Sequence, residues 1–299
     1  MVNGAVLASA AHERKELTTR ERTEMTYKSA LKILLGAGAL LGWLAGIAQA
    51  DTIEDIKKKG TLVVGVKADY PPYGYRDPSG QIVGMEIDMA KQVADKLGVK
   101  LQLEPVVASN RMQFLQQGKT DLMIATMSIN EERKKAVGIV EPPYYAGGVA
   151  LLAAKSANIK SGADLKGKPV CAIQGSYYNN DIQSKMTQTN LIAFKGVPEN
   201  EQALINGQCV GFAYDDVLLI YKKKSDADKW KDFEVVKLTE ITPLPWGLAV
   251  KTEDKDTAWG KFMSDMVTEW HKKGTLVELE KKWLGENTQW LLDMNAKMK

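Results

Sequence analysis

Two side chains of opposite charge suit the two ends of a free amino acid. Arg133 falls in the first turn of a helix that the sequence predicts to begin after Asn130. A guanidinium group there offers two parallel donors to a carboxylate, beside the free N–H groups of the helix end. Asp215 follows the apolar segment CVGFAY, and its carboxylate can accept hydrogen bonds from an ammonium group. The pair therefore predicts a site for a zwitterion.

The other candidate residues share one property, which is that each follows a predicted strand. Ligands of open α/β sheets bind at the carboxyl ends of the strands, so these positions predict the lining of the site. Hydroxyl and backbone groups would assist the arginine, and tyrosine rings would cover the aliphatic part of the ligand. The candidates are Tyr70, Tyr73, Thr126, Met127, Ser128, Gln174, Gly175, Ser176 and Tyr177.

Each of these residues also has a purely structural interpretation. Arg133 can pair with a neighbouring acid, Glu131 or Glu132, on the surface. Asp215 can serve only as a helix cap, a role that Asp216 can equally fill. The tyrosines can be core or turn residues. The joint placement of all of them is what favours a binding site.

Several classes of chemistry are excluded by the residues present. After residue 50 only His271 remains, on a charged segment where we expect an exposed side chain, so histidine-based triads and metal sites are excluded. Nucleotide, zinc and calcium motifs are absent, and we expect no metal and no cofactor. Residues 1–50 hold six of the 40 Lys/Arg and four of the 37 Asp/Glu, which leaves about +1 for the rest. That balance argues against nucleic acid as a partner.

Residues 1–50 have the pattern of an N-terminal extension and a secretion signal. Lys28 and Lys32 precede the uncharged apolar run 33–47, and the small-x-small motif 48–50 predicts cleavage after Ala50. The run is shorter than the roughly 20 residues that a membrane-spanning helix needs. Residues 1–24 are polar, so Met25 is an alternative start. We expect a soluble protein exported to the periplasm.

The two cysteines, Cys171 and Cys209, predict one disulfide in an exported chain, with two buried thiols as the alternative.

The rest of the chain alternates strand patterns with amphipathic helices, which predicts an α/β fold. In a first series, strands at 61–68, 101–103 and 121–126 enclose a helix closed by Gly98 and a short helix capped by Ser109 or Asn110. A second series from Gly147 has strands at 149–153, 169–173, 191–194 and 209–214 and a helix at 217–223. A strand at 247–250 and a helical tail from Thr257 follow. The lysine runs 57–59 and 222–224 are expected to be solvated helix ends.

Five segments in order resemble the family 3 solute-binding proteins, the polar amino-acid receptors of ABC importers. They are GTLVVGVKADYPPYGYRD, GQIVGMEIDMAKQVADKLG, LQQGKTDLMIATMSINEERKK, ADLKGKPVCAIQGS and CVGFAYDD, within residues 60–285. The resemblance implies a type II periplasmic-binding fold of two α/β lobes joined by two crossover segments. Lobe 1 would comprise 51–146 plus 244–299, and lobe 2 would comprise 147–243. It also implies a free amino acid and an inner-membrane ABC permease as partners, a monomer, and no catalysis.

The resemblance also implies residue roles. Arg133, assisted by Ser128 and Thr126, would bind the α-carboxylate, and Asp215 would bind the ammonium group. Tyr70 and Tyr73 would form aromatic walls, and Ser176 a contact from lobe 2. Tyr177 departs from the small hydroxyl residue common in the family, which leaves that contact open.

Ligand identity and activity each keep an alternative. The segment Ser109-Asn110-Arg111 resembles members that bind glutamate or aspartate, so Arg111 would meet a side-chain carboxylate. Tyr214 and Trp246 equally suit glutamine or a larger side chain. Exported cyclohexadienyl dehydratases share the fold and would need an acid such as Asp216 or Glu141, but no perturbed carboxylate pair is evident. A sensory module would need a membrane or signalling domain, for which the sequence has no segment.

Overall fold

The computed structural model describes residues 51–186 and 188–299, which form one compact unit from Asp51 onward. The predicted secretion signal, its cleavage site and the alternative start at Met25 lie outside the described residues. Within the described part, no helix is both long and apolar enough to cross a membrane.

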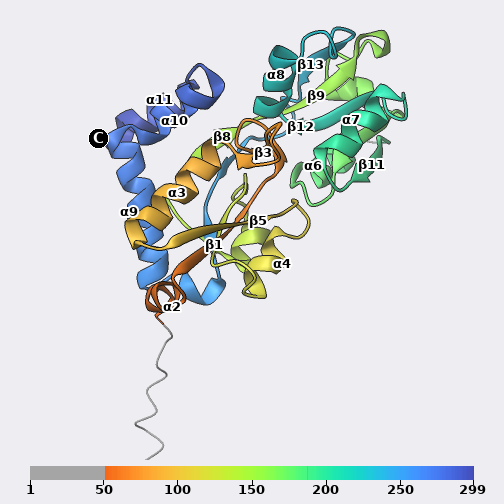
Figure 1. Ribbon diagram of the computed structural model, residues 1–299. Helices are drawn as coiled ribbons and strands as arrows, with labels where there is room; N and C mark the ends of the chain where they lie inside the picture. The colour runs from red at the N-terminus through yellow and green to blue at the C-terminus, as the bar shows by residue number, and fades with distance from the viewer. Residues whose placement is uncertain (1–50, 187) are drawn as a thin grey trace, which may run out of the picture. The chain divides into compact units, whose positions relative to one another are not determined.

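The first of two five-stranded sheets has the order β5-β1-β6-β15-β7 (Figure 1). Strand β1 (Thr61–Val66) lies parallel to β5 (Lys100–Pro105) and to β6 (Leu122–Ile124). Strand β15 (Ala249–Val250) returns antiparallel between β6 and β7 (Gly138–Ile139). The side chains of β6, β7 and β15 are buried, as their apolar sequences require.

Helices α3 (Met85–Leu97), α4 (Arg111–Gln116) and α5 (Glu131–Ala136) connect the strands of this sheet. The predicted end of α3 is confirmed, because Gly98 adopts a left-handed conformation with φ +71° and closes the helix. The predicted cap of α4 is wrong. The Asn110 side chain accepts from the Val107 N–H at 2.9 Å, behind the helix, and does not cap it.

The second sheet has the order β11-β10-β12-β9-β13. Strand β10 (Pro169–Ile173) is parallel to β11 (Asn190–Phe194) and β12 (Gly211–Asp215), and β9 (Val149–Ala154) is antiparallel to β12 and β13 (Phe233–Lys237). The connecting helices, seen beside this sheet in Figure 1, are α6 (Tyr178–Lys185), α7 (Val197–Ile205) and α8 (Asp216–Ser225).

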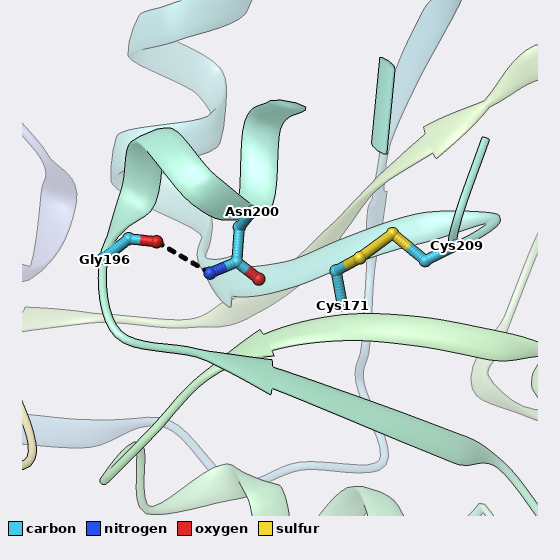
Figure 2. The surroundings of a disulfide bond; sticks show 4 residues. All are labelled: Cys171, Gly196, Asn200 and Cys209. Carbon is cyan, nitrogen blue, oxygen red and sulfur yellow. Dashed lines mark hydrogen bonds between the residues drawn. A yellow bond between two sulfur atoms is a disulfide. The ribbon is translucent and has the colours of Figure 1, made fainter. Parts of the chain in front are cut away.

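The predicted disulfide is confirmed. Cys171 of β10 and Cys209, which precedes β12, are bonded with their Cα atoms 5.7 Å apart, and both residues are buried (Figure 2). The bridge lies below α7, where the Asn200 side chain donates to the Gly196 carbonyl at 2.8 Å. It therefore fastens the start of β12 to β10.

The chain passes between the two sheets twice. Strand β8 (Tyr145–Gly147) leads into the second sheet, β14 (Leu244–Trp246) leads back, and the two pair antiparallel. We call the residues of these two strands the crossing segments. The predicted division into two lobes at these segments stays a prediction.

The remaining elements cover the first sheet or connect strands. Helix α9 (Ala258–Lys273) packs on α2 (Thr52–Lys59), and α10 (Thr275–Leu284) packs on α3. Helix α11 (Gln289–Met298) packs on α9 and near β8. The short strands β2 (Asp69–Tyr70), β3 (Gly74–Arg76) and β4 (Ile82–Val83) form a separate sheet. Short 3-10 helices occupy Lys155–Ala157, Gly162–Leu165 and Thr252–Asp254.

The prediction for His271 is wrong, and the one for the lysine run 222–224 is right only in that the run ends α8 and Lys224 is exposed. His271 is buried, not exposed, because α11 covers it and its Nε2 lies 2.8 Å from the Pro143 carbonyl. In the run 222–224, Lys222 pairs with the buried Glu201 and Lys223 donates to the Trp230 carbonyl at 2.8 Å. Each side chain has a partner in the fold that local sequence does not reveal.

Candidate functional site

Arg133 joins the first sheet's helix α5 to the second sheet. The Asn130 side chain accepts from the Arg133 N–H at 2.8 Å, which confirms the predicted helix start. The guanidinium is buried, and its Nη1 donates to the Ser128 carbonyl at 2.9 Å while Nη2 donates to the Gly175 carbonyl at 2.9 Å. Glu131 pairs instead with Lys134 at 3.1 Å. Arg133 therefore points inward.

Burial, and after it the positive charge of Arg111, lowers the pKa of Arg133 to about 9. A buried cation of this kind is stabilised when an anion approaches it. The guanidinium is therefore suited to receive a carboxylate.

Asp215 stands at the end of β12 and does not cap α8. Its Oδ2 instead accepts a hydrogen bond from the Tyr70 hydroxyl at 2.7 Å, while Asp216 accepts from the Gly148 N–H at 2.9 Å. Burial raises the pKa of Asp215 to about 7, and the Tyr70 hydrogen bond opposes that rise. The charges of Arg111 and Arg133 also reach this carboxyl and lower its pKa. A cation placed against Asp215 would stabilise its charged form.

Aromatic rings surround these two charges. Tyr70 lies 5.5 Å from Tyr73 and 5.2 Å from Tyr214, measured between ring centroids, and Trp246 lies 5.1 Å from Tyr73. All four side chains are buried, and burial raises the pKa of each tyrosine. The sequence placed Tyr70 and Tyr73 in the site. Tyr214 and Trp246, which the sequence offered for glutamine or a larger side chain, lie in the same cluster.

The segment Thr126–Ser128 follows β6 and faces the crossing segments. Met127 is buried and its carbonyl accepts from the Gly247 N–H at 2.9 Å, while Ser128 forms a β-bridge with Trp246. Arg111 Nη1 donates to the carbonyls of Ala125 and Thr126, the latter at 3.0 Å. Arg111 is buried, and its Nε has no partner within the described residues. One arm of this guanidinium is therefore occupied by backbone.

The predicted residues 174–177 divide into two groups. Gly175 adopts φ +81° and lies against Ser109, because an ideal Cβ on Gly175 would stand 2.8 Å from the Ser109 Cα. Its carbonyl accepts from Arg133 Nη2, and Ser176, the next residue, is half-buried. Gln174 is exposed and donates to the Ala193 carbonyl at 3.2 Å, and the Tyr177 hydroxyl donates to the Thr242 carbonyl at 3.2 Å. The Gln174 side chain is thus bonded to the second sheet, and the Tyr177 hydroxyl to the segment between β13 and β14.

Sequence reasoning missed several buried charges near the site. Glu86 of α3 is fully buried, and burial raises its pKa to about 7. Asp215 and Glu86 are thus two buried carboxyls whose pKa values are raised separately, each by its own burial. Lys67 is fully buried and lies 2.8 Å from Asp69, whose other oxygen accepts from the Val197 N–H of α7 at 3.1 Å. In the sequence, the signal for these buried charges was an acid or a lysine within an apolar segment.

No group of three or more His, Cys, Asp or Glu side chains that could hold a metal ion occurs in residues 51–186 and 188–299.

Comparison with known proteins gives consistent matches. The model of the bacterial extracellular solute-binding proteins, family 3, matches residues 62–286. The ABC transporter glutamine-binding protein GlnH of Bacillus subtilis is 34% identical over 80% of this chain and 87% of its own. The L-cystine-binding protein TcyJ of Escherichia coli is 28% identical over 84% of this chain and 96% of its own.

Among solved structures, the ancestral amino acid-binding protein AncCDT-1, a precursor of cyclohexadienyl dehydratase, is 30% identical with a TM-score of 0.70. It covers 78% of this chain and 99% of its own. The predicted fold class, the type II fold of periplasmic amino-acid-binding proteins, is thereby confirmed.

Proposed function

Because the chain belongs to the bacterial extracellular solute-binding proteins, family 3, we propose that it binds a free polar amino acid between its two sheets. Arg133 would hold the α-carboxylate, with the Thr126 and Ser128 groups beside it. Asp215 would hold the ammonium group, and the rings of Tyr70, Tyr73, Tyr214 and Trp246 would enclose the side chain. Gly175 and Ser176 would supply contacts from the second sheet.

The observation that carries the proposal is the burial of Arg133 and Asp215 within reach of each other's charge. Each perturbs the other's pKa, and burial disfavours the charged form of both. A zwitterion brings an anion to the arginine and a cation to the aspartate, so it relieves both penalties at once. A solute without charged groups would relieve neither penalty.

For the ligand's side chain we propose a polar group of the glutamate or glutamine kind. Arg111 is a buried cation near the site, and its unpartnered Nε supports an acidic side chain. Two backbone carbonyls hold Nη1 and so fix the guanidinium in place. Its other N–H groups could equally donate to the amide oxygen of a glutamine side chain. The likeness to a glutamine-binding protein supports glutamine as the second candidate.

The relatives' role in ABC import supports delivery of the amino acid to a membrane permease. We propose that the protein works outside the inner membrane, as a monomer, after cleavage at Ala50. Ligand contacts from both sheets would favour the closed arrangement, so that a permease could distinguish loaded from empty protein.

A thermal-unfolding panel tests the proposal. Protein beginning at Asp51 is unfolded and refolded with its disulfide intact to remove carried ligand, and is then scanned with each of the twenty amino acids and L-cystine. A selective rise in Tm that grows with ligand concentration is expected, as mass action requires. Arg133→Ala should abolish the rise, whereas Arg76→Ala, which changes an exposed arginine, should keep it. Full affinity in Arg133→Ala would refute the carboxylate site.

A cyclohexadienyl dehydratase is the second candidate, because Asp215 and Glu86 both have pKa values raised to about 7 and such groups can act as general acids. Loss of carbon dioxide and water from prephenate or arogenate would reveal this activity. Turnover that disappears in Asp215→Asn would replace the receptor proposal, and absence of turnover with a selective amino-acid response would leave it.

A further inference from the structure

Glu86 is a buried carboxylate at a junction of three segments. It lies in the first turn of α3 and has no exposed surface. Its Oε1 accepts from the Thr126 N–H at 2.8 Å and from the Tyr144 hydroxyl, while Oε2 has no partner within the described residues. One oxygen atom thus joins the end of β6 to the residue that precedes the first crossing segment.

Thr126 has a backbone conformation that needs external support. Its φ of +46° falls in the left-handed region, which is unfavourable for a residue with a branched Cβ. Glu86 holds the N–H of this residue, and Arg111 Nη1 holds its carbonyl at 3.0 Å. The two side chains therefore fix the peptide groups on both sides of Thr126, and with them the direction in which the next residues leave β6.

The next residues are bonded to the second crossing segment. Gly247 N–H donates to the Met127 carbonyl at 2.9 Å, and Ile129 N–H donates to the Pro245 carbonyl at 2.8 Å. Tyr144, the other donor to Glu86, gives its own N–H to the Trp246 carbonyl at 2.9 Å. Glu86 is consequently linked, through Tyr144 and through the segment that begins at Thr126, to both routes by which the chain passes between the sheets.

We propose that Glu86 is a positioning residue, which sets the Thr126 peptide for the ligand and links the ligand-binding segment to the crossing segments. That the Thr126 peptide meets a ligand rests on the proposed function. That Glu86 fixes this peptide rests on the hydrogen-bond geometry alone. Its role does not require a negative charge, because a neutral acceptor oxygen at the same place can receive both donors.

The Glu86 carboxyl opposes its own burial, since desolvation raises its pKa to about 7. The hydrogen bonds to Thr126 and Tyr144 are what the burial secures.

The chain offers a matched control. Glu280 of α10 is also a fully buried carboxylate, accepts from a tyrosine hydroxyl (Tyr145, 2.6 Å) and accepts from a backbone N–H (Thr288, 2.9 Å). Its bonds are to Tyr145 of β8 and to Asn287 and Thr288 before α11, and none is to the segment after β6. Glu280→Ala therefore removes the same kind of group without touching Thr126.

The test measures hydrogen exchange at the Thr126 amide and ligand affinity in Glu86→Ala, Glu86→Gln, Tyr144→Phe and Glu280→Ala. Exchange at Thr126 is followed without ligand, and affinity is measured by calorimetry with L-glutamine, L-glutamate and L-cystine. Glu86→Ala should speed exchange at Thr126 at least about tenfold and weaken binding by a similar factor, because two buried donors lose their acceptor. Glu86→Gln should restore both, and Glu280→Ala should leave exchange at the Thr126 amide unchanged.

Tyr144→Phe separates the two parts of the role. It should leave exchange at Thr126 close to that of the parent protein and still weaken binding, because only the link to the crossing segment is removed. If Glu86→Ala folds and Thr126 exchanges as slowly as in the parent, the inference is overturned whatever the ligand. If exchange rises but the parent protein binds no amino acid, the positioning role stands and the proposed function fails.

Discussion

Replacing Asp215 by asparagine should make the ligand-free protein more stable and unable to bind. The Asp215 carboxyl has a pKa of about 7 in the fold, against 3.8 for an unperturbed aspartate. A carboxyl with a raised pKa favours the fold fully below its unfolded pKa, and this contribution is lost as pH rises through 7. The charged, buried carboxylate is therefore a net cost at neutral and alkaline pH.

The size of the effect follows from the two pKa values. At pH 8 the shift corresponds to about 4 kcal/mol in the free energy of unfolding, and about 3 kcal/mol of that appears between pH 5 and pH 8. The asparagine oxygen can still accept from the Tyr70 hydroxyl, so the variant avoids the charge and keeps the hydrogen bond. Asp215→Asn should exceed the parent's stability by about 4 kcal/mol at pH 8 and by only about 1 to 2 kcal/mol at pH 5.

Urea unfolding of both refolded, ligand-free proteins at pH 5, 6.5 and 8, followed by tryptophan fluorescence, measures this difference. His271, whose pKa is lowered by burial, changes stability with pH in the opposite direction, but it is common to both proteins and cancels. The difference should widen as pH rises. A difference that is absent at pH 8, or the same at pH 5 and pH 8, would refute the assignment of a buried, uncompensated carboxylate.

Two further substitutions test the structure. Gly175→Ala should weaken amino-acid binding at least about tenfold in calorimetry, because a Cβ would stand 2.8 Å from the Ser109 Cα. Gly167→Ala is the control, since its φ of +72° carries a similar backbone strain with no atom nearby, and this variant should bind normally. Equal affinities would contradict the close approach. Removing the disulfide as Cys171→Ala/Cys209→Ala opens a loop with a sequence separation of 38 and should lower the free energy of unfolding by roughly 4 kcal/mol in a urea titration.

Much of the fold was predictable because its signals are local. The apolar positions of α3 recur at helical spacing, and a left-handed glycine ends the helix. Residues 85–98 are therefore sufficient to predict this helix and its end. The buried strands β6 and β10 were equally clear as short apolar runs. The strand predicted at 247–250 was less accurate. A separate strand, β14, begins at Leu244 and pairs with β8, and only Ala249–Val250 joins the first sheet.

The site was predictable only where its residues follow strands. That rule predicts Arg133 and Asp215 as ligand contacts, which stays a prediction, and the structure buries both within electrostatic reach of each other. Glu86 could not be assigned in this way, because its partners Thr126 and Tyr144 are 40 and 58 residues away in the sequence. His271 was wrong for the same reason, since the helix that covers it comes later in the chain. Long-range packing determines the burial and the partners of such side chains, and the local sequence pattern does not predict that packing.

The hydrogen bond between Asp69 and the Val197 N–H gives helix α7 an end that it lacks by itself. Gly196 occupies the cap position of α7 and has no side chain to offer, so the cap comes from Asp69 of β2, at a sequence separation of 128 residues. A helix cap is worth about 1 kcal/mol, which corresponds to roughly a fivefold change in an equilibrium at 25 °C. The first turn of helix α7 therefore has its cap only while β2, and with it the three-stranded sheet, lies against that helix.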